Sequence, residues 1–101
     1  MKAKIKTIDV NCLEWFDKIN GNSYFAGRVT INYGLKTELT FKIPFQYGYG
    51  DHYEYIARDI LIKNGYKLDK NTRLSRYCRE NDIIYRGRKI ENCLKRELKN
   101  Y

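Results

Sequence analysis

The stretch from Phe45 to Tyr55, FQYGYGDHYEY, constrains the fold more than any other, because the periodicity of the chain changes there. Before it, in Thr37–Phe45, apolar and polar side chains alternate as in a half-buried strand. After it, apolar side chains recur at helical spacing. Its two glycines permit a sharp turn, and Asp51 with Glu54 three residues later is the pattern of a capping box. The sequence therefore predicts a strand–turn–helix junction with Asp51 as the helix cap.

The N-terminal half has the pattern of an antiparallel meander. Strands are expected at Lys4–Phe16, Ser23–Gly34 and Thr37–Phe45, and the first two are joined by an Asn-Gly hairpin turn. In the third strand, Leu39, Phe41, Ile43 and Phe45 share one face. Pro44 lacks an N–H group and favours an edge position or the end of a strand.

The C-terminal half is predicted to be helical. A first helix runs from His52 to Asn64 with Gly65 as its left-handed stop, and it covers the apolar face of the meander. A second helix spans about Thr72–Glu80, and a terminal helix spans Ile90–Tyr101. Between them we expect a short strand, Ile83–Tyr85, and a basic turn, Arg86–Lys89. The prediction is one α+β domain over residues 1–101, with a three-stranded meander in 1–48 and two to three packing helices in the basic half, 51–101.

The positive charge of the chain is unevenly distributed. Residues 58–101 contain thirteen Lys or Arg against six Asp or Glu, and residues 1–57 contain seven against six. Such an excess attracts nucleic acid or an acidic protein surface, and it argues against a mimic of DNA.

Arginines on the outer face of the second predicted helix, three residues apart, form a basic ridge with the turn that follows. Arginine pairs bidentately with phosphate and stacks on bases, so this ridge and the aromatic turn are the predicted binding site for a partner or nucleic acid. The predicted residues are Arg73, Arg76, Arg79, Arg86, Arg88, Lys89, Tyr47, Tyr49, His52 and Tyr85. A solvated face is the plain alternative. Two helices followed by a basic turn also suggest a helix-turn-helix, although the linker 66–71 is long for one.

No spacing in the sequence is diagnostic of catalysis. Asp51, His52, Tyr47 and Tyr49 form the one conceivable acid–base cluster, and the alternative is a packed corner. The GYGD turn lacks the glycine and lysine of phosphate-binding loops. Three widely spaced cysteines favour reduced thiols, and no metal site or cofactor is predicted. We predict a non-enzymatic protein of the cytoplasm, without a secretory leader or membrane span.

Two strings, WFDKINGNSYFAGRVTINYG (Trp15–Gly34) and PFQYGYGDHYEYIA (Pro44–Ala57), resemble those of small uncharacterised bacteriophage proteins. The resemblance implies a phage accessory protein in the cytoplasm of a bacterial host. By analogy with other small phage proteins, it implies binding and inhibition of a host nucleic-acid-handling or defence complex, in the manner of an anti-CRISPR. The main alternative is a direct DNA- or RNA-binding protein, such as a helix-turn-helix-like phage regulator. Monomer and homodimer both remain open.

Overall fold

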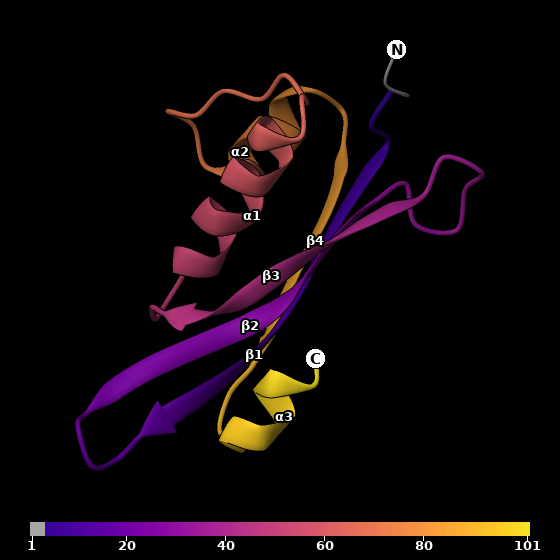
Figure 1. Cartoon of the computed structure of the whole chain (residues 1–101). Helices are drawn as coiled ribbons and strands as arrows, with labels where there is room; N and C mark the ends of the chain where they lie inside the picture. Colours follow the sequence, from indigo (N-terminus) through magenta and orange to yellow (C-terminus); the bar gives the residue numbers. More distant parts are fainter. Residues whose placement is uncertain (1–3) are drawn as a thin grey trace.

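The computed structural model describes residues 4–101, and residues 1–3 of the predicted domain lie outside the described part. Within residues 4–101, four strands and three helices follow one another in an α+β arrangement (Figure 1). In chain order they are β1 (Thr7–Asp17), β2 (Asn22–Ile31), β3 (Leu39–Tyr47), α1 (His52–Lys63), α2 (Leu74–Glu80), β4 (Ile84–Ile90) and α3 (Lys95–Lys99).

The strands form one mixed sheet in the order β3-β2-β1-β4. β1, β2 and β3 pair antiparallel, as the meander prediction expected, but β4 pairs in parallel with β1 and adds a fourth strand. The prediction of a basic turn at Arg86–Lys89 is wrong, because these residues are the middle of β4. The expected edge position of Pro44 is confirmed, since β3 is an edge strand.

β4 alternates between two environments, which is why a basic segment can be a strand. Tyr85 lies opposite Ile8 of β1 and packs against the hydrophobic core, whereas Arg86 lies opposite Asp9 on the other face. The strand starts after a tight turn in which Asp82 has a φ of 57° and the Ile83 N–H donates to the Cys78 carbonyl. Side chains therefore alternate between the two faces of the sheet from Ile84 to Ile90, and only every second one points toward the helices.

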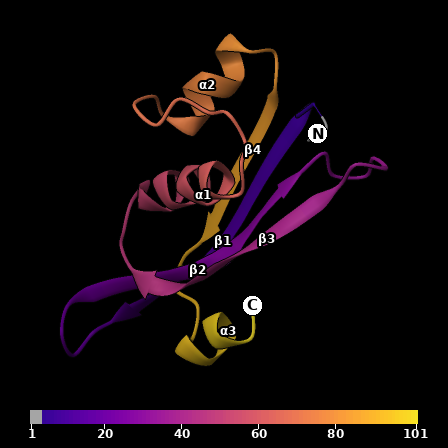
Figure 2. The ribbon, with the colours of Figure 1, turned by 45° about the horizontal axis from the view of Figure 1, so that its top comes forward.

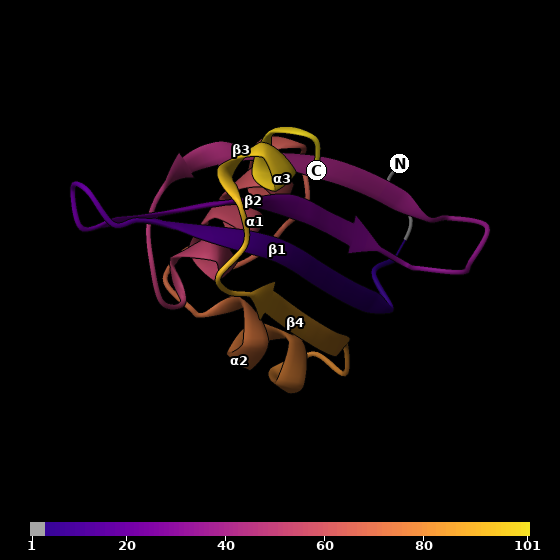
Figure 3. The ribbon, with the colours of Figure 1, turned by 90° about the horizontal axis from the view of Figure 1, so that it is seen from below.

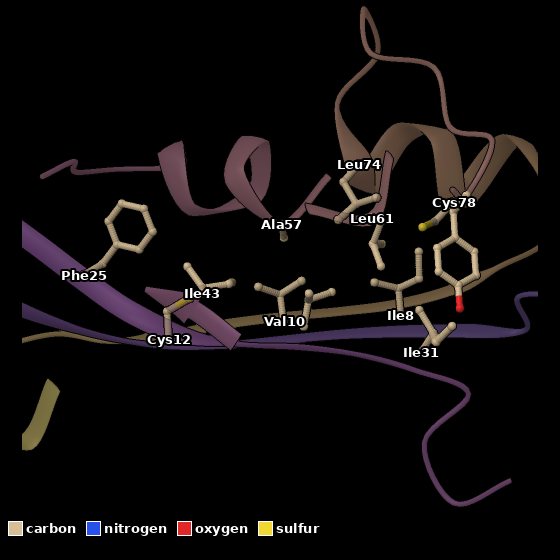
Figure 4. Packing of buried hydrophobic residues seen from close by; sticks show 12 residues of the cluster. Ile8, Val10, Cys12, Phe25, Ile31, Ile43, Ala57, Leu61, Leu74 and Cys78 are labelled. Atoms are coloured by element: carbon tan, nitrogen blue, oxygen red, sulfur yellow. The ribbon is translucent and has the colours of Figure 1, made fainter. Parts of the chain in front are cut away.

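One face of the sheet, here called the covered face, packs against α1 and α2 (Figure 2). Val10, Phe25 and Ile43 of the strands meet Ala57 and Leu61 of α1, and all five side chains are at most 1% exposed (Figure 4). The prediction that the apolar stripe of the first helix packs over the sheet is thus confirmed. Burial of this stripe, rather than helix propensity, holds α1 in place.

α1 begins at His52 and ends before Gly65, as predicted, but the predicted capping box at its start is not formed. Gly65 has a φ of 93°, and the N–H groups of Gly65 and Tyr66 donate to the carbonyls of Ile62 and Leu61, as in a Schellman motif. At the other end, the Asp51 side chain makes no capping hydrogen bond. Its carboxylate is instead 2.9 Å from Arg73, so the predicted capping box is wrong.

The opposite face, here called the open face, is crossed only by α3 among residues 4–101 (Figure 3). Leu98 of α3 is buried, and α3 contacts β1 and β2 near Ala26, which is 1% exposed although it points away from the core. The terminal helix is shorter than predicted, because Ile90 belongs to β4 and the helix begins at Lys95. Much of the open face therefore stays accessible.

A bulge in β3 sends one predicted core residue to the open face. The β2–β3 register shifts between Phe25 and Gly27, opposite Pro44 and Phe45. Phe45 then stacks on Tyr24 with ring centroids 5.3 Å apart, on the face away from α1. The expectation that Phe45 shares a face with Ile43 is wrong for this reason.

Candidate functional site

The open face carries a row of basic side chains that crosses all four strands. Arg88 of β4 lies opposite Asn11 of β1, Asn11 opposite Arg28 of β2, and Arg28 opposite Lys42 of β3. Side chains opposite one another in a sheet share a face. All four are exposed, and we call them the cation row. It contains three positive charges, an amide and no carboxylate.

A second row beside it is paired within itself. Arg86 donates two hydrogen bonds to Asp9, from Nε at 2.5 Å and from Nη2 at 3.1 Å, and this pairing raises the pKa of the guanidinium. Next along the row, the hydroxyls of Thr30 and Thr40 are 3.0 Å apart. Charges in this row largely cancel, so of the two rows only the cation row has a net positive charge.

A groove of about 480 Å³ lies over these two rows. Its floor is sheet, and its walls come from outside the sheet. Tyr101, which follows α3, has its ring centroid 5.1 Å from Cζ of Arg28. The opposite wall is made by Tyr33 and Glu38 from the β2–β3 turn. The lining residues are Asp9, Asn11, Arg28, Thr30, Tyr33, Glu38, Thr40, Arg86 and Tyr101.

The wall at the β2–β3 turn is fixed by Asn32, which is fully buried. Its side-chain oxygen accepts the Lys6 N–H at 2.7 Å, and its amide donates to the Thr37 hydroxyl at 2.9 Å. Its φ of 53° is a left-handed conformation that asparagine tolerates better than most residues. Glu38 accepts the Gly34 N–H at 2.7 Å and closes the turn. Tyr33 is therefore presented from a rigid base.

The distribution of charge favours this face over the helices. Residues 51–82, which include α1 and α2, contain seven Lys or Arg and six Asp or Glu. Residues 83–101, which include β4 and α3, contain six Lys or Arg and only two Asp or Glu. Of the net +5 in residues 51–101, +4 thus lies in the segment that contains β4 and α3.

The predicted basic ridge is divided between two sides of the molecule. Arg73, Arg76 and Arg79 lie on α2 or at its start, on the covered side. Arg86 and Arg88 lie on the open face. Arg76 is paired with Glu80, whereas Arg79 is exposed and has no ion-pair partner within residues 4–101. The ten predicted residues therefore do not form one continuous surface.

Three of the predicted site residues have structural contacts instead. Arg73 Nη2 is 2.9 Å from Asp51 and 2.8 Å from the nearly buried carboxylate of Glu54. Lys89 is only 10% exposed and pairs with Glu14 at 3.0 Å. Tyr85 packs against the core, and burial raises the pKa of its hydroxyl. These contacts join α1, α2 and β4 to the sheet.

The aromatic turn does bring its predicted residues together. Tyr47, Tyr49 and His52 line a shallow pocket of about 270 Å³ around Gly48. The rings of Tyr47 and Tyr49 meet edge to face at 6.0 Å. A Cβ at Gly48 would lie 2.6 Å from the His52 ring, so glycine is required for this close packing. The pocket is rimmed by exposed rings, which suits an anchor contact with a partner.

Aromatic rings continue from this pocket across the open face. Trp15 stacks on Tyr24 at 5.5 Å, Tyr24 stacks on Phe45, and Tyr47 meets Tyr24 edge to face at 5.8 Å. Lys95, the first residue of α3, lies over Trp15 with Nζ 5.2 Å from the ring centroid. α3 thus separates an aromatic region on one side from the groove on the other.

Sequence reasoning missed most of the open-face site. Its residues absent from the prediction are Asp9, Asn11, Arg28, Thr30, Tyr33, Glu38, Thr40, Lys42 and Tyr101. The alternation of β2 and β3 already placed Arg28, Thr30 and Lys42 on polar faces, which was the available signal. What the alternation did not show is that β4 brings Arg88 into the same row.

Two of the three cysteines lie in the core. Cys12 and Cys78 are buried free thiols, and burial raises the pKa of Cys12 to about 12 and that of Cys78 to about 11. Neutral buried thiols are poor nucleophiles. Within residues 4–101 there is no group of three or more His, Cys, Asp or Glu placed to hold a metal ion.

Comparison of the chain with protein families, with curated proteins and with solved structures found no match. Among the described helices, none has the length and apolar character needed to cross a membrane.

Proposed function

We propose that this chain is a non-enzymatic binding protein that engages and inhibits a host nucleic-acid-handling or defence complex, as its resemblance to small phage proteins implies. The contact surface is the open face. The single observation that carries the proposal is the cation row, Arg88–Asn11–Arg28–Lys42, which is exposed across the whole width of the sheet. A row of cations without a carboxylate requires an anionic partner surface to be of use in binding.

The aromatic turn supplies the second part of the contact. Tyr47 and Tyr49 are 54% and 65% exposed, and tyrosine is enriched among residues that dominate binding energy at interfaces. In this proposal, the cation row steers the partner and the rings at the turn anchor it. Both carboxylates that line the groove already have partners, because Asp9 accepts from Arg86 and Glu38 accepts the Gly34 N–H, and this favours binding over catalysis.

Direct binding to DNA or RNA is the second candidate function. It is favoured by the groove beside the cation row, whose mixed donors and acceptors suit a nucleotide. The open face supports this candidate better than the helices do. α2 has only seven residues, and Arg73 at its start is held between Asp51 and Glu54.

The proposal is tested by affinity capture from nuclease-treated bacterial lysate with two matched charge-reversal variants. Arg28→Glu/Arg88→Glu alters the open face, and Arg76→Glu/Arg79→Glu makes the same change in net charge on α2. We expect loss of the captured complex with the first variant and retention with the second. The opposite pattern would move the contact to α2, and capture unaffected by either variant would overturn a charge-based contact.

A further inference from the structure

The geometry of the open face narrows the kind of anion that fits it. Neighbouring strands are about 4.8 Å apart, so the cation row extends roughly 14 Å perpendicular to the strands. The row is straight, because each member is directly opposite the next in register. A linear series of charges across the sheet matches an extended polyanion better than a single bound anion.

The groove beside the row has the size and chemistry for a planar ring. Its volume of about 480 Å³ is in the usual range for small-molecule sites. Tyr33 is 66% exposed at one wall, and Tyr101 stands at the other. Between them, Thr30 and Thr40 offer hydroxyls, Asn11 offers an amide, and Glu38 offers a carboxylate. These groups pair with the donors and acceptors on the edge of a nucleobase.

We propose that the ligand of the open face is single-stranded nucleic acid, with its phosphates along the cation row and an unpaired base in the groove between Tyr33 and Tyr101. This inference rests on the second candidate of the proposed function, direct binding to DNA or RNA, since it uses the same face and names the anion. The strand crosses the sheet from β4 to β3. Arg28 is central, because it belongs to the row and also lies against the ring of Tyr101.

Two features of the groove favour a single strand over other polyanions. A duplex keeps its bases stacked inside, so it cannot place a ring between Tyr33 and Tyr101 without flipping a base. An acidic peptide offers carboxylates, which would meet Asp9 and Glu38 in the groove. A strand of nucleic acid carries its phosphates apart from its bases, and the face likewise has Arg88 and Lys42 of the cation row outside the groove and the threonine hydroxyls within it.

The test is fluorescence anisotropy with a labelled oligothymidylate and oligouridylate of about 12 nucleotides, within the range that one small domain covers. The same length of duplex DNA and labelled heparin are the comparison ligands. We expect the single strands to bind at least tenfold more tightly than the duplex. For three phosphate contacts, the slope of log K against log salt should be about −2, and Arg28→Ala/Arg88→Ala should make it shallower by about 1.4.

The groove is tested separately from the charges. Tyr33→Ala should weaken binding to the single strands about tenfold, the loss of one base–aromatic stack, and leave heparin binding unchanged. Tyr33→Phe should restore it, since the ring is kept. Arg76→Ala/Arg79→Ala is the charge-matched control, with less than a twofold effect expected. A thermal melt of each variant confirms that it is folded.

Three results would overturn the inference. The first is a duplex or heparin bound as tightly as the single strands, and the second is no effect of Tyr33→Ala. The third is no binding of any oligonucleotide at low salt. If lysate capture still depends on Arg28 and Arg88 in the third case, the proposed function stands and its anion is a protein surface. If no oligonucleotide binds and lysate capture does not depend on Arg28 and Arg88 either, both proposals fail.

Discussion

Lys89 and Glu14 form an ion pair between β4 and β1, with Nζ 3.0 Å from Oε1, although 75 residues separate them in the chain. The Lys89 ammonium also donates to the Gly50 carbonyl at 2.8 Å and lies 5.8 Å from the centroid of the Tyr53 ring. Both charged side chains are about one-tenth exposed. One lysine thus joins the parallel strand pair to the turn that begins α1.

Replacing Lys89 with Met should destabilise the fold by about 3 kcal/mol, because the Glu14 carboxylate would remain buried without its partner. Urea denaturation followed by far-UV circular dichroism measures this change. The neighbouring Arg88 points to the other face and is exposed, so Arg88→Met is the control, with a change below about 0.5 kcal/mol. Equal effects of the two substitutions would contradict the opposite environments of these residues.

Arg73 is expected to act in folding rather than in partner capture. It contacts both Asp51 and Glu54, and the Glu54 side chain is only 7% exposed. Arg73→Met should lower the urea midpoint, because it leaves a nearly buried carboxylate unpaired. Glu54→Gln in the same background should recover part of the loss. A double-mutant cycle measures the interaction energy between the two side chains. Strict additivity of the two changes in unfolding free energy would show that this interaction energy is zero.

Gly27 is predicted to tolerate no side chain. A Cβ at this position would lie 2.2 Å from the Asn11 carbonyl oxygen and 2.6 Å from Cys12 Sγ. Gly27→Ala should therefore displace β2 from β1 and destabilise the fold by about 2 kcal/mol or more. Gly21→Asn is the comparison, since that position has a φ of 69° and nothing within 4 Å of the added Cβ, and asparagine accepts this backbone. Urea midpoints of both variants decide between crowding and a general cost of losing glycine.

Thiol labelling should distinguish the three cysteines. Cys12 and Cys78 are buried, whereas Cys93 is partly exposed. With Ellman's reagent at pH 8, one thiol should react quickly in the native protein and three should react in denaturant. Cys93→Ala should abolish the fast phase. Rapid reaction of two or three thiols in the native state would show that the core opens readily at Cys12 or Cys78.

The same two buried thiols make stability sensitive to alkaline pH. Their folded pKa values, about 12 for Cys12 and about 11 for Cys78, lie above the ordinary value of 9.0. Above pH 9 the unfolded thiols ionise and the folded ones do not, so the unfolded state binds fewer protons and stability falls with rising pH. The loss continues until the folded thiols ionise, near pH 11 to 12.

Each thiol contributes a slope of up to about 1.4 kcal/mol per pH unit in that range. Cys12→Ala/Cys78→Ala should therefore show a shallower decline of unfolding free energy between pH 9 and pH 11 than the unaltered protein. Urea titrations at several pH values measure both slopes. Parallel declines would mean that other groups cause the alkaline loss.

The parts of the fold that follow from local pattern were predictable. The alternation in β2 and β3 and the stripe of α1 identify their buried faces, and Gly65 identifies the end of α1. These features depend on residues within a few positions of one another. The physical reason is that one buried face imposes a period of two or 3.6 whatever the rest of the chain does.

The parts that depend on distant residues were not predictable. Lys89 lies on the buried side of β4. A lysine is tolerated there because its ammonium pairs with Glu14 and donates a hydrogen bond to the Gly50 carbonyl. Asp51 has the sequence of a cap, but Arg73 captures its carboxylate. The cation row of the candidate site likewise exists only once β4 has paired with β1, so no local pattern contains it.

The parallel pairing of β1 with β4 imposes an order of assembly. During synthesis the hairpins β1–β2 and β2–β3 can close as soon as Tyr47 has been made, but the outer edge of β1 has no partner until Ile90 follows. Long-range pairings of this kind are slow steps in folding. For that interval the nascent protein exposes the backbone of a central strand, so the two helices and β4 also act as the closing segment that removes an aggregation-prone edge.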